Sequence, residues 1–297
     1  MITLANLFSR IPGGATQGII YGIMAIGIYL TYKVLNISDL TADGSFATGG
    51  AVSIILIVSG VNSVISLLIA FLAGIIIGTV TGLLHTKGKI PAILAGILVQ
   101  FGLYSINLHI LNDSANVSAN PDRFALLISM RNISQSFITV LLISILLIII
   151  LYWYFGTEQG CAIRATGCNP NMARAQSINV DKCKIIGIAL SNGIIALAGG
   201  LMGQFQGFTD INMGRGSVVI GLAAIIIGEI LLKLLKRNTA SFYTKLFSII
   251  IGGIIYYLIM TIILWLRINS NDLKLFTAII VALFLIIGNK KQGEENA

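Results

Sequence analysis

Residues 136–155 read SFITVLLISILLIIILYWYF and contain no charged side chain. An α-helix needs about 20 apolar residues to cross the hydrocarbon core of a membrane, so this stretch predicts a transmembrane helix. The whole chain of 297 residues has the same character, because 56% of its residues are hydrophobic and 10% are charged. A soluble domain carries about 25% charged residues. The sequence therefore predicts an all-α, polytopic bundle in a lipid bilayer and excludes a soluble enzyme, a disordered chain and a nucleic-acid-binding protein.

Similar apolar segments recur along the chain and predict about eight or nine transmembrane helices in a single domain over residues 1–297. The segments are about 15–33, 43–60, 62–84, 90–111, 136–155, 184–207, 217–235, 243–266 and 273–288. The second and seventh segments begin with polar residues, so we expect them either to cross the membrane or to be broken or re-entrant helices.

Lysines and arginines predict the orientation, because the cytoplasmic loops of a membrane protein carry more of them. With nine crossings and the C-terminus inside, 13 lie inside and 6 outside. The inner ones are Lys33, Lys87, Lys89, Arg164, Arg174, Lys182, Lys184, Lys233, Lys236, Arg237, Lys245, Lys290 and Lys291; the outer ones are Arg10, Arg123, Arg131, Arg215, Arg267 and Lys274. We therefore expect a multi-pass protein of the plasma membrane with a cytoplasmic C-terminus.

Glycines and a self-match indicate how the helices pack. Gly74, Gly78 and Gly82 lie on one helical face and predict close approach of a neighbouring helix. At an offset of 171 residues, Gly22-Ile23, Ala25 and Ile26 recur as Gly193-Ile194, Ala196 and Leu197, and Ser38-Asp39-Leu40 recurs as Thr209-Asp210-Ile211. After a slip of one residue, Gly44-Ser45 and Gly49 recur as Gly216-Ser217 and Gly221. An odd number of crossings separates the copies, which predicts an inverted repeat of the kind found in transporters.

Acidic residues in or beside the apolar segments are costly in a bilayer and are therefore informative. Asp43 begins the second segment and is interpreted as a helix N-cap or first-turn acid. Asp39 and Asp210 occupy the same place in the two repeats, which favours capping for both. Glu229 lies four residues before Lys233, so it forms either an i,i+4 ion pair or an inter-helix hydrogen bond near a translocation path.

Uncharged polar residues complete a set of candidates for that path. Gln100, Tyr104 and Asn107 fall on one face at helical spacing, and they either line a path or bond to neighbouring helices. The full set of candidates is Asp43, Ser45, Gln100, Tyr104, Asn107, Asn192 and Glu229.

The chain has no catalytic motif, no P-loop and no metal-ligand spacing among its three cysteines. We therefore expect a protein that is not an enzyme and that holds no cofactor or metal of its own. Energy for transport would then come from a partner ATPase or from an ion gradient.

The predicted cytoplasmic loop 156–183 contains the start of a helix. Asn169-Pro170 places an N-cap residue before a proline at the first helical position. This pair predicts a short helix from Pro170 to about Ser177, between two long membrane helices. Such a helix is either an ordered connector or a lever that a cytoplasmic motor grips.

The same loop resembles a known family. Its pattern Gly160-x3-Arg164-Ala165-x-Gly167-x-Asn169-Pro170-x2-Ala173 is similar to the cytoplasmic coupling segment of ABC-transporter permeases of the branched-chain amino acid/ribose type. Two further stretches resemble a subgroup of this family whose members are paired with lipoprotein solute receptors. They are Asp39-Leu40-Thr41-x-Asp43-Gly44-Ser45-Phe46 and Gly221-Leu222-Ala223-Ala224…Gly228-Glu229. The resemblance extends over nearly the whole chain.

The resemblance implies the membrane subunit of an ATP-driven importer. Its partners would be a second permease copy, cytoplasmic subunits that bind the ATP, and an external solute-binding lipoprotein. The residues implied in coupling to the ATPase are Arg164, Gly167, Asn169, Pro170, Ala173 and Arg174. Members of the subgroup import amino acids, including aromatic ones, and others in the wider family import sugars or nucleosides. The alternative is an ion-coupled secondary transporter, for which Asp43 and Glu229 are the candidate ion ligands.

Overall fold

The computed structural model describes residues 4–234, 241–266, 272, 275–279, 281, 282 and 284. Eight helices in this part of the chain are long and apolar enough to cross a membrane, which confirms the predicted all-α membrane fold. They are α1 (Leu4–Tyr29, continued by a π-helical turn, η1, at Leu30–Val34), α2 (Thr41–Val58), α3 (Ser63–Thr86), α4 (Ala92–Ile110), α5 (Ile133–Gly156), α8 (Val180–Gln206), α9 (Ser217–Leu234) and α10 (Phe242–Trp265). Half of the ninth predicted segment, 273–288, lies outside the described residues.

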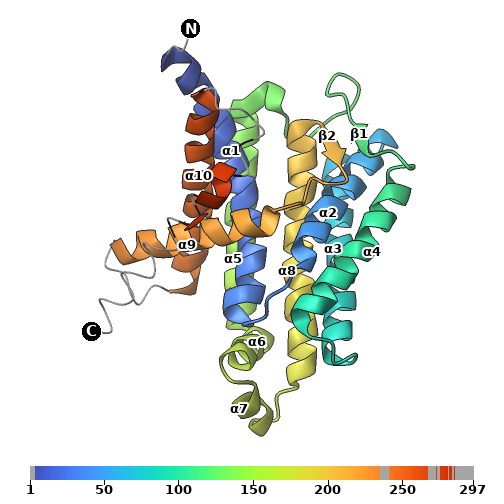
Figure 1. Ribbon diagram of the computed structural model, residues 1–297, viewed down its shortest axis with the longest axis vertical. Coiled ribbons are helices and arrows are strands. Elements are labelled where there is room, and N and C mark those ends of the chain that lie inside the picture. Colours follow the sequence, from blue (N-terminus) through green and yellow to red (C-terminus); the bar gives the residue numbers. More distant parts are fainter. Residues whose placement is uncertain are drawn as a thin grey trace.

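Shorter elements lie at the two ends of the molecule (Figure 1). The helices α6 (Glu158–Cys168) and α7 (Pro170–Ala175) form one end, here called the α7 end. At the opposite end, here called the strand end, β1 (Asn116–Ser118) pairs antiparallel with β2 (Phe208–Asp210). The sequence did not predict this pair, because strands of three residues are too short to produce a periodic pattern.

Basic residues predicted to face the cytoplasm gather at the α7 end, where Lys33, Arg164 and Lys245 line one cavity. The predicted external residue Arg131 lies instead in the segment after β1, where it pairs with Asp122. Six other charges of the orientation argument, Lys236, Arg237, Arg267, Lys274, Lys290 and Lys291, lie outside the described residues. Lys33, Arg164 and Lys245 therefore lie at the opposite end of the molecule from Arg131, as the sequence predicted for these four residues.

The packing of the helices supports the predicted inverted repeat. α1 runs from the strand end to the α7 end, whereas α8 runs back (Figure 1). α8 packs on α2 and α3, and α1 packs correspondingly on α9 and α10. A Cβ atom on Gly49 of α2 would lie 1.9 Å from the carbonyl oxygen of Ala196 in α8, and one on Gly221 of α9 would lie 3.6 Å from the Cα of Ala25 in α1. The sequence match relates Ala25 to Ala196 and Gly49 to Gly221. The contact of Gly49 with Ala196 is therefore equivalent to the contact of Gly221 with Ala25, with the two repeats interchanged.

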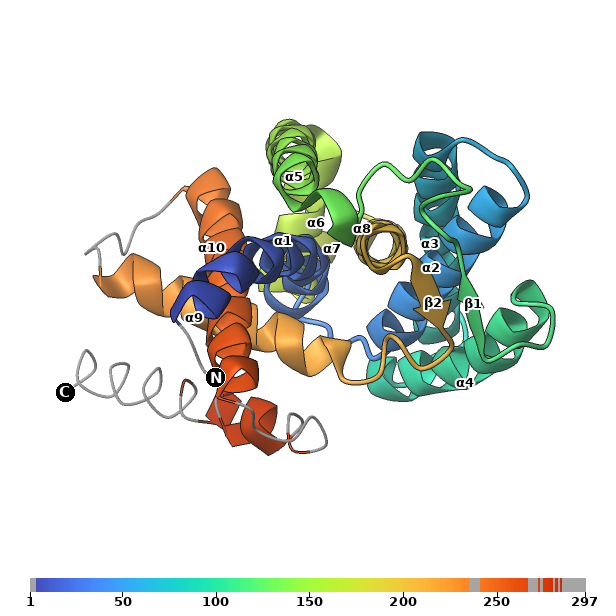
Figure 2. The same cartoon turned by 90° about the horizontal axis from the view of Figure 1, so that it is seen from above.

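α2 and α9 are the shortest of the eight spans, with 18 residues each. Both helices are continuous, so the expected alternative of a break inside them is wrong. Each follows a non-helical connection, residues 35–40 before α2 and residues 211–216 before α9. α9 runs across the long axis of the molecule in Figure 1, and Figure 2 shows it side-on where α5 and α8 are seen nearly end-on. The N-terminus of α9 therefore lies part-way along the bundle.

The glycine face of α3 packs directly on the backbone of α8. Cβ atoms on Gly74, Gly78 and Gly82 would lie between 2.4 and 2.9 Å from backbone atoms of α8. Real Cβ atoms do not approach backbone so closely, so the three positions require glycine for this helix pair to form. The prediction of close helix packing is confirmed.

We expect Gly78→Leu to reduce the amount of folded protein, because its Cβ alone would lie 2.5 Å from the carbonyl oxygen of Ile188. Overpacking of a core costs about 1–3 kcal/mol. Gly102→Leu on α4 is the matched control, since nothing lies within 4 Å of the Cβ position at Gly102. Size-exclusion chromatography of detergent extracts should show a smaller monodisperse fraction for Gly78→Leu alone. Equal yields of the two variants would contradict the tight contact between α3 and α8.

Candidate translocation site and coupling segment

Four of the seven predicted path residues line one cavity of about 300 Å³, namely Asp43, Gln100, Tyr104 and Asn107. The cavity lies where the N-terminal turn of α2 meets one face of α4 and the connection that leads into α9. Its other lining residues are Gly44, Ala47, Phe101, Ile211, Gly214 and Arg215. Small-molecule sites have volumes of about 300–1,000 Å³, so this cavity has room for a small solute.

Asp43 joins the two short helices at the cavity. It lies in the first turn of α2, as predicted, but its carboxylate caps α9. Oδ1 accepts hydrogen bonds from Ser217 Oγ at 2.8 Å and Val218 N at 2.9 Å, and Oδ2 accepts one from Gly216 N at 3.1 Å. The first N–H groups of a helix have no partner within the helix and carry a partial positive charge. One carboxylate therefore stabilises the N-terminus of α9 from the first turn of α2.

Asp39 and Asp210, the equivalent acids of the two repeats, make the same local bond. Asp39 Oδ1 accepts from Thr41 N at 2.9 Å, and Asp210 Oδ1 accepts from Asn212 N at 2.7 Å. Both are Asx-turns, in which the side chain bonds to the backbone two residues on. The bond of Asp39 to the first residue of α2 confirms its predicted capping role, whereas Asp210 stabilises the connection before α9.

Ser45 and Asn192 belong to a buried network behind the cavity and do not line it. Ser45 Oγ donates to Asn192 Oδ1 at 2.6 Å, and Asn192 Nδ2 donates to Asp39 Oδ2 at 2.7 Å. Both Ser45 and Asn192 are 0% exposed. Polar side chains of this kind bond helices together in membrane proteins, so these two candidates hold α2 against α8.

Glu229 also lies away from the cavity, and its predicted pairing with Lys233 is wrong. Its Oε1 lies 3.0 Å from Nζ of Lys33, at the end of η1, and its Oε2 accepts a hydrogen bond from the same group at 3.2 Å. The packing of α1 on α9 brings Lys33 to Glu229, although 196 residues separate them in the chain. Glu229 therefore makes an inter-helix contact, but at the α7 end and not near the cavity as that alternative expected.

Sequence reasoning missed Arg215 as a lining residue and placed it in an external loop. A Cβ atom on Gly214 would lie 1.8 Å from the backbone oxygen of Asp43, so the connection before α9 is pressed against α2 and brings Arg215 to the cavity. No local sequence pattern predicts such a contact between distant segments. Phe101 was also missed, because it follows Gln100 directly and so lies off the helical face that Gln100, Tyr104 and Asn107 share.

The short helix predicted to begin at Pro170 is present as α7. Asn169 is its N-cap residue, and its Oδ1 accepts hydrogen bonds from the backbone nitrogens of Asn171 and Met172, both at 3.1 Å. Pro170 is the first helical residue, as the sequence predicted. The helix ends at Ala175, slightly before the predicted end at Ser177.

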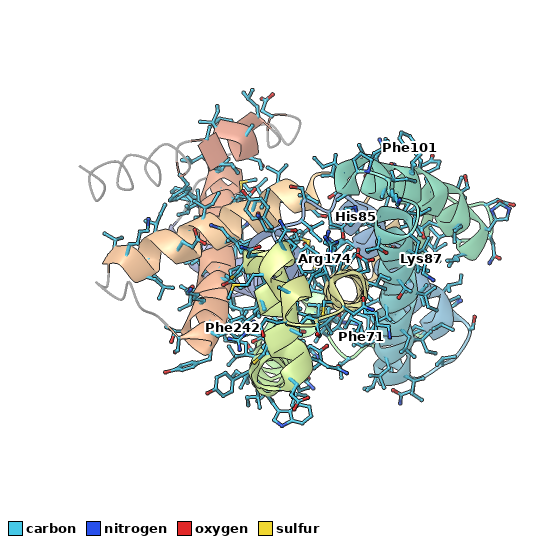
Figure 3. All side chains as sticks on the ribbon, turned by 90° about the horizontal axis from the view of Figure 1, so that it is seen from below. Phe71, His85, Lys87, Phe101, Arg174 and Phe242 are labelled. Carbon is cyan, nitrogen blue, oxygen red and sulfur yellow. The ribbon has the colours of Figure 1, made fainter. Side chains whose placement is uncertain are left out.

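The side chains of α7 divide between the protein and its surroundings. Ala173 is 3% exposed and is buried against the protein. Met172 is 64% exposed, and the side chain of Arg174 is 60% exposed and lies 4.0 Å from Asp181. Figure 3 shows Arg174 and Lys87 on the face seen from below, with α7 in front. The end of the molecule thus presents an ordered turn with an apolar and a basic side chain.

α6 fastens this end to the membrane helices through the other two coupling candidates. A Cβ atom on Gly167 would lie 1.8 Å from the carbonyl oxygen of Val34, the last residue of η1. Arg164 Nη2 donates to the carbonyl oxygen of Phe155 at 2.9 Å, in the last turn of α5. Gly167 and Arg164 therefore connect α6 to α1 and α5.

The sequence did not predict α6. A usable signal was Thr157 before Glu158, because a threonine N-cap followed by an acid in the first turn marks a helix start. Thr157 Oγ1 accepts from Gly160 N at 3.4 Å in the structure.

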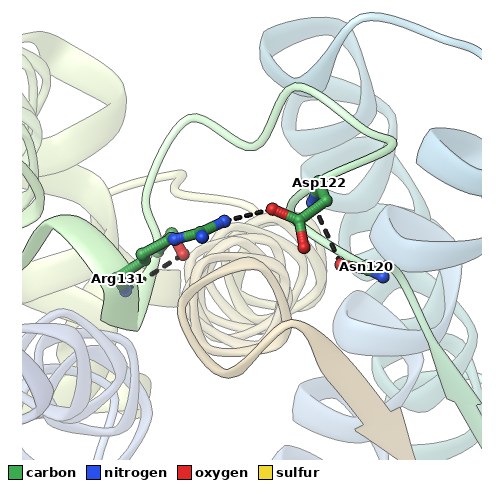
Figure 4. Close-up of polar contacts among 4 residues, drawn as sticks. Asn120, Asp122 and Arg131 are labelled. Carbon is green, nitrogen blue, oxygen red and sulfur yellow. Dashed lines mark hydrogen bonds and ion pairs between the residues drawn. The ribbon is translucent and has the colours of Figure 1, made fainter.

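The loop at the strand end is held by polar contacts of its own. Figure 4 shows the guanidinium of Arg131 directed at the carboxylate of Asp122, with which it forms an ion pair. The backbone nitrogen of Asp122 donates to Asn120 Oδ1 at 3.0 Å. Gln204 of α8 accepts from the backbone nitrogen of Leu127 at 3.2 Å, which fastens the loop to the bundle.

Known proteins resemble the chain over nearly its full length. Residues 10–288 match the family described as branched-chain amino acid transport system / permease component. The chain is 39% identical to the tyrosine transport system permease protein of Clostridioides difficile (strain R20291), over 92% of this chain and 90% of that protein. It is 26% identical to the ribose import permease protein RbsC of Escherichia coli (strain K12), over 98% of this chain and 87% of that protein. No solved structure matches it.

Family membership also bears on the prediction that the chain is not an enzyme. The matched family is the permease component of its transport system, and the permease component is not itself catalytic. The helical bundle and the match over residues 10–288 agree. The chain belongs to the family of ABC-transporter permeases of the branched-chain amino acid/ribose type.

Proposed function

We propose that two copies of this chain form the pore of an importer in the plasma membrane. The importer takes up amino acids, including aromatic ones, that an external lipoprotein delivers. The family itself is an importer permease that works with an ATPase and a binding protein. The amino-acid substrate is supported by the relative named for tyrosine transport. ATP is bound by the partner subunit, and this chain contributes no cofactor.

The observation that carries the coupling role is the construction of α7. Its N-terminus is capped by Asn169, and Met172 and Arg174 project from it. An ATPase subunit would grip this helix from the cytoplasm, because the side chains that face away from the bundle match an interface with an apolar centre and a charged rim.

A movement of α7 would reach the cavity through the first helix. Gly167 of α6 touches Val34 at the end of η1, and residues 35–40 lead from there directly into α2. α2 carries Asp43, which caps α9 at the cavity. Displacing α6 would therefore shift both short helices together and change the shape of the cavity between outward and inward states.

The rival reading, an ion-coupled secondary transporter, requires acids available to an ion. Both candidate acids are engaged in the described part of the chain. Asp43 accepts three hydrogen bonds from the start of α9, and Glu229 is paired with Lys33. Neither acid is left without a partner, and together with the family match this supports ATP as the energy source.

We expect Arg174→Glu to uncouple the transporter. In proteoliposomes that contain the permease with its ATPase and receptor, ATP-driven tyrosine uptake, receptor-stimulated ATP hydrolysis and co-purification of the ATPase should fall together. Bringing like charges together in an interface costs several kcal/mol. Combining Arg174→Glu with Arg164→Glu should deepen the defect, because Arg164 also holds α6 on α5.

Arg174→Lys is the matched control, since it keeps the charge and should retain most of the uptake. Wild-type uptake by Arg174→Glu would contradict the coupling role of α7. Uptake that persists without any ATPase would favour the ion-coupled rival.

We expect Lys87 and Lys290 to be cytoplasmic and Asp122 to be external, because the positive charges gather at the α7 end. Single cysteines can be placed at these positions after Cys161, Cys168 and Cys183 have been replaced by serine. A membrane-impermeant maleimide should label only position 122 in intact cells and all three positions in lysed cells. External labelling at position 87 would reverse the orientation.

A further inference from the structure

The cavity beside Asp43 presents both signs of charge in one small space. Asp43 contributes a carboxylate and Arg215 a guanidinium to its lining. The side chain of Arg215 is exposed, and no carboxylate pairs with it among the residues that the structure describes. The cavity therefore offers an unpaired cation to an anionic group.

The carboxylate of Asp43 retains capacity for another hydrogen bond. A carboxylate has about four acceptor positions, and the start of α9 uses three of them. Only one of those bonds reaches Oδ2. A further donor can approach this atom from the cavity without displacing the cap.

Asn107 supplies an independent sign of a missing partner. Asn107 lines the cavity and is 2% exposed. Its side-chain oxygen Oδ1 has no hydrogen-bond partner among the described residues. Buried polar atoms are nearly always paired in native proteins, and an unpaired one needs an explanation. A ligand that donates a hydrogen to this oxygen would supply it.

Apart from Gln100, the rest of the cavity wall is apolar and aromatic. Phe101 is 74% exposed and Tyr104 is 44% exposed on the α4 side, and Ala47 and Ile211 lie on the opposite elements. Figure 3 shows Phe101 at the edge of the molecule, on the side of α4 that faces away from the bundle. An apolar or aromatic group can pack on these surfaces.

We propose that this cavity is a transient binding site for an α-amino acid in its zwitterionic form. The ammonium group donates to Asn107 Oδ1 and to the free position of the Asp43 carboxylate, the carboxylate group pairs with Arg215, and the side chain packs on Phe101 and Tyr104. The proposal rests on the proposed amino-acid importer and names residues in the permease itself that recognise the solute after the receptor releases it.

The proposed movement of α2 and α9 would release an amino acid from this site. Asp43 belongs to α2, Asn107 to α4, and Arg215 to the connection before α9. A shift of α2 and α9 relative to α4 separates the ammonium partners from each other and from Arg215. Weak binding that is lost on this shift suits a permease, which must release its solute.

The test measures binding to the permease–ATPase complex in nanodiscs without receptor. Tritiated L-tyrosine and L-leucine are the ligands. The competitors are tyramine, which lacks the carboxylate, and 3-(4-hydroxyphenyl)propionate, which lacks the ammonium group. We expect saturable binding of both amino acids and weaker competition by each analogue than by unlabelled tyrosine.

Two variants assign the groups. Arg215→Gln should weaken tyrosine binding about tenfold, as expected for the loss of one hydrogen bond to a charged group, and leave tyramine binding unchanged. Asn107→Leu should weaken tyrosine and tyramine alike, and Asn107→Asp, which keeps the acceptor, should restore binding. Arg123→Gln in the outer loop is the matched control and should bind as the wild type does.

Absence of saturable binding, or unchanged binding by both Arg215→Gln and Asn107→Leu, would overturn the site. If tyrosine uptake is still driven by ATP in that case, the proposed importer stands and only the cavity is excluded. Import of a sugar and of no amino acid by the complete transporter would instead refute the proposed substrate class.

Discussion

The structure depends on a helix N-terminus that begins inside the bundle and is capped from another helix. α9 starts part-way along the molecule (Figure 1), where its first N–H groups have no partners of their own helix. In a membrane such groups cannot be left unpaired, because no water is present to bond them. Asp43 supplies the carboxylate for Gly216, Ser217 and Val218. This contact fixes the start of α9 to the first turn of α2, beside the cavity.

The same contact links the two repeats. It also belongs to a chain of contacts that connects the α7 end with the cavity. α1 packs on α9 and α10, and α8 packs on α2 and α3, so each repeat is completed by the other. Asp43 adds a contact between the repeats where the two short helices, α2 and α9, begin. The proposed coupling segment, α6 and α7, contacts Val34 at the end of η1 through Gly167, and residues 35–40 lead from there into α2. A permease built in this way can change its cavity by moving short helices while the glycine-packed long helices remain in contact.

Much of this architecture could be predicted from local sequence, and the residues show where such reasoning ends. The spans follow from uncharged apolar runs, and α7 follows from Asn169-Pro170, because these signals act within one helix. Gln100, Tyr104 and Asn107 were grouped correctly because they share a face of one helix. The pairing of Glu229 with Lys33 and the place of Arg215 at the cavity could not be predicted from local sequence, because the packing of distant segments brings these neighbours together. Capping of α9 by Asp43 is likewise a contact between repeats, which no single segment encodes.

The most direct test of this account compares Asp43→Asn with Asp210→Asn by thermal unfolding of the purified protein in detergent. Asp43→Asn removes the charge and turns an amide donor toward the donors of α9, whereas Asn can replace Asp210 in its Asx-turn. Hydrogen bonds to charged groups contribute about 1.5–3 kcal/mol each. The account predicts a Tm several degrees lower for Asp43→Asn and a Tm near that of the wild type for Asp210→Asn. Equal Tm values for the two variants would contradict the claim that Asp43 holds the two repeats together.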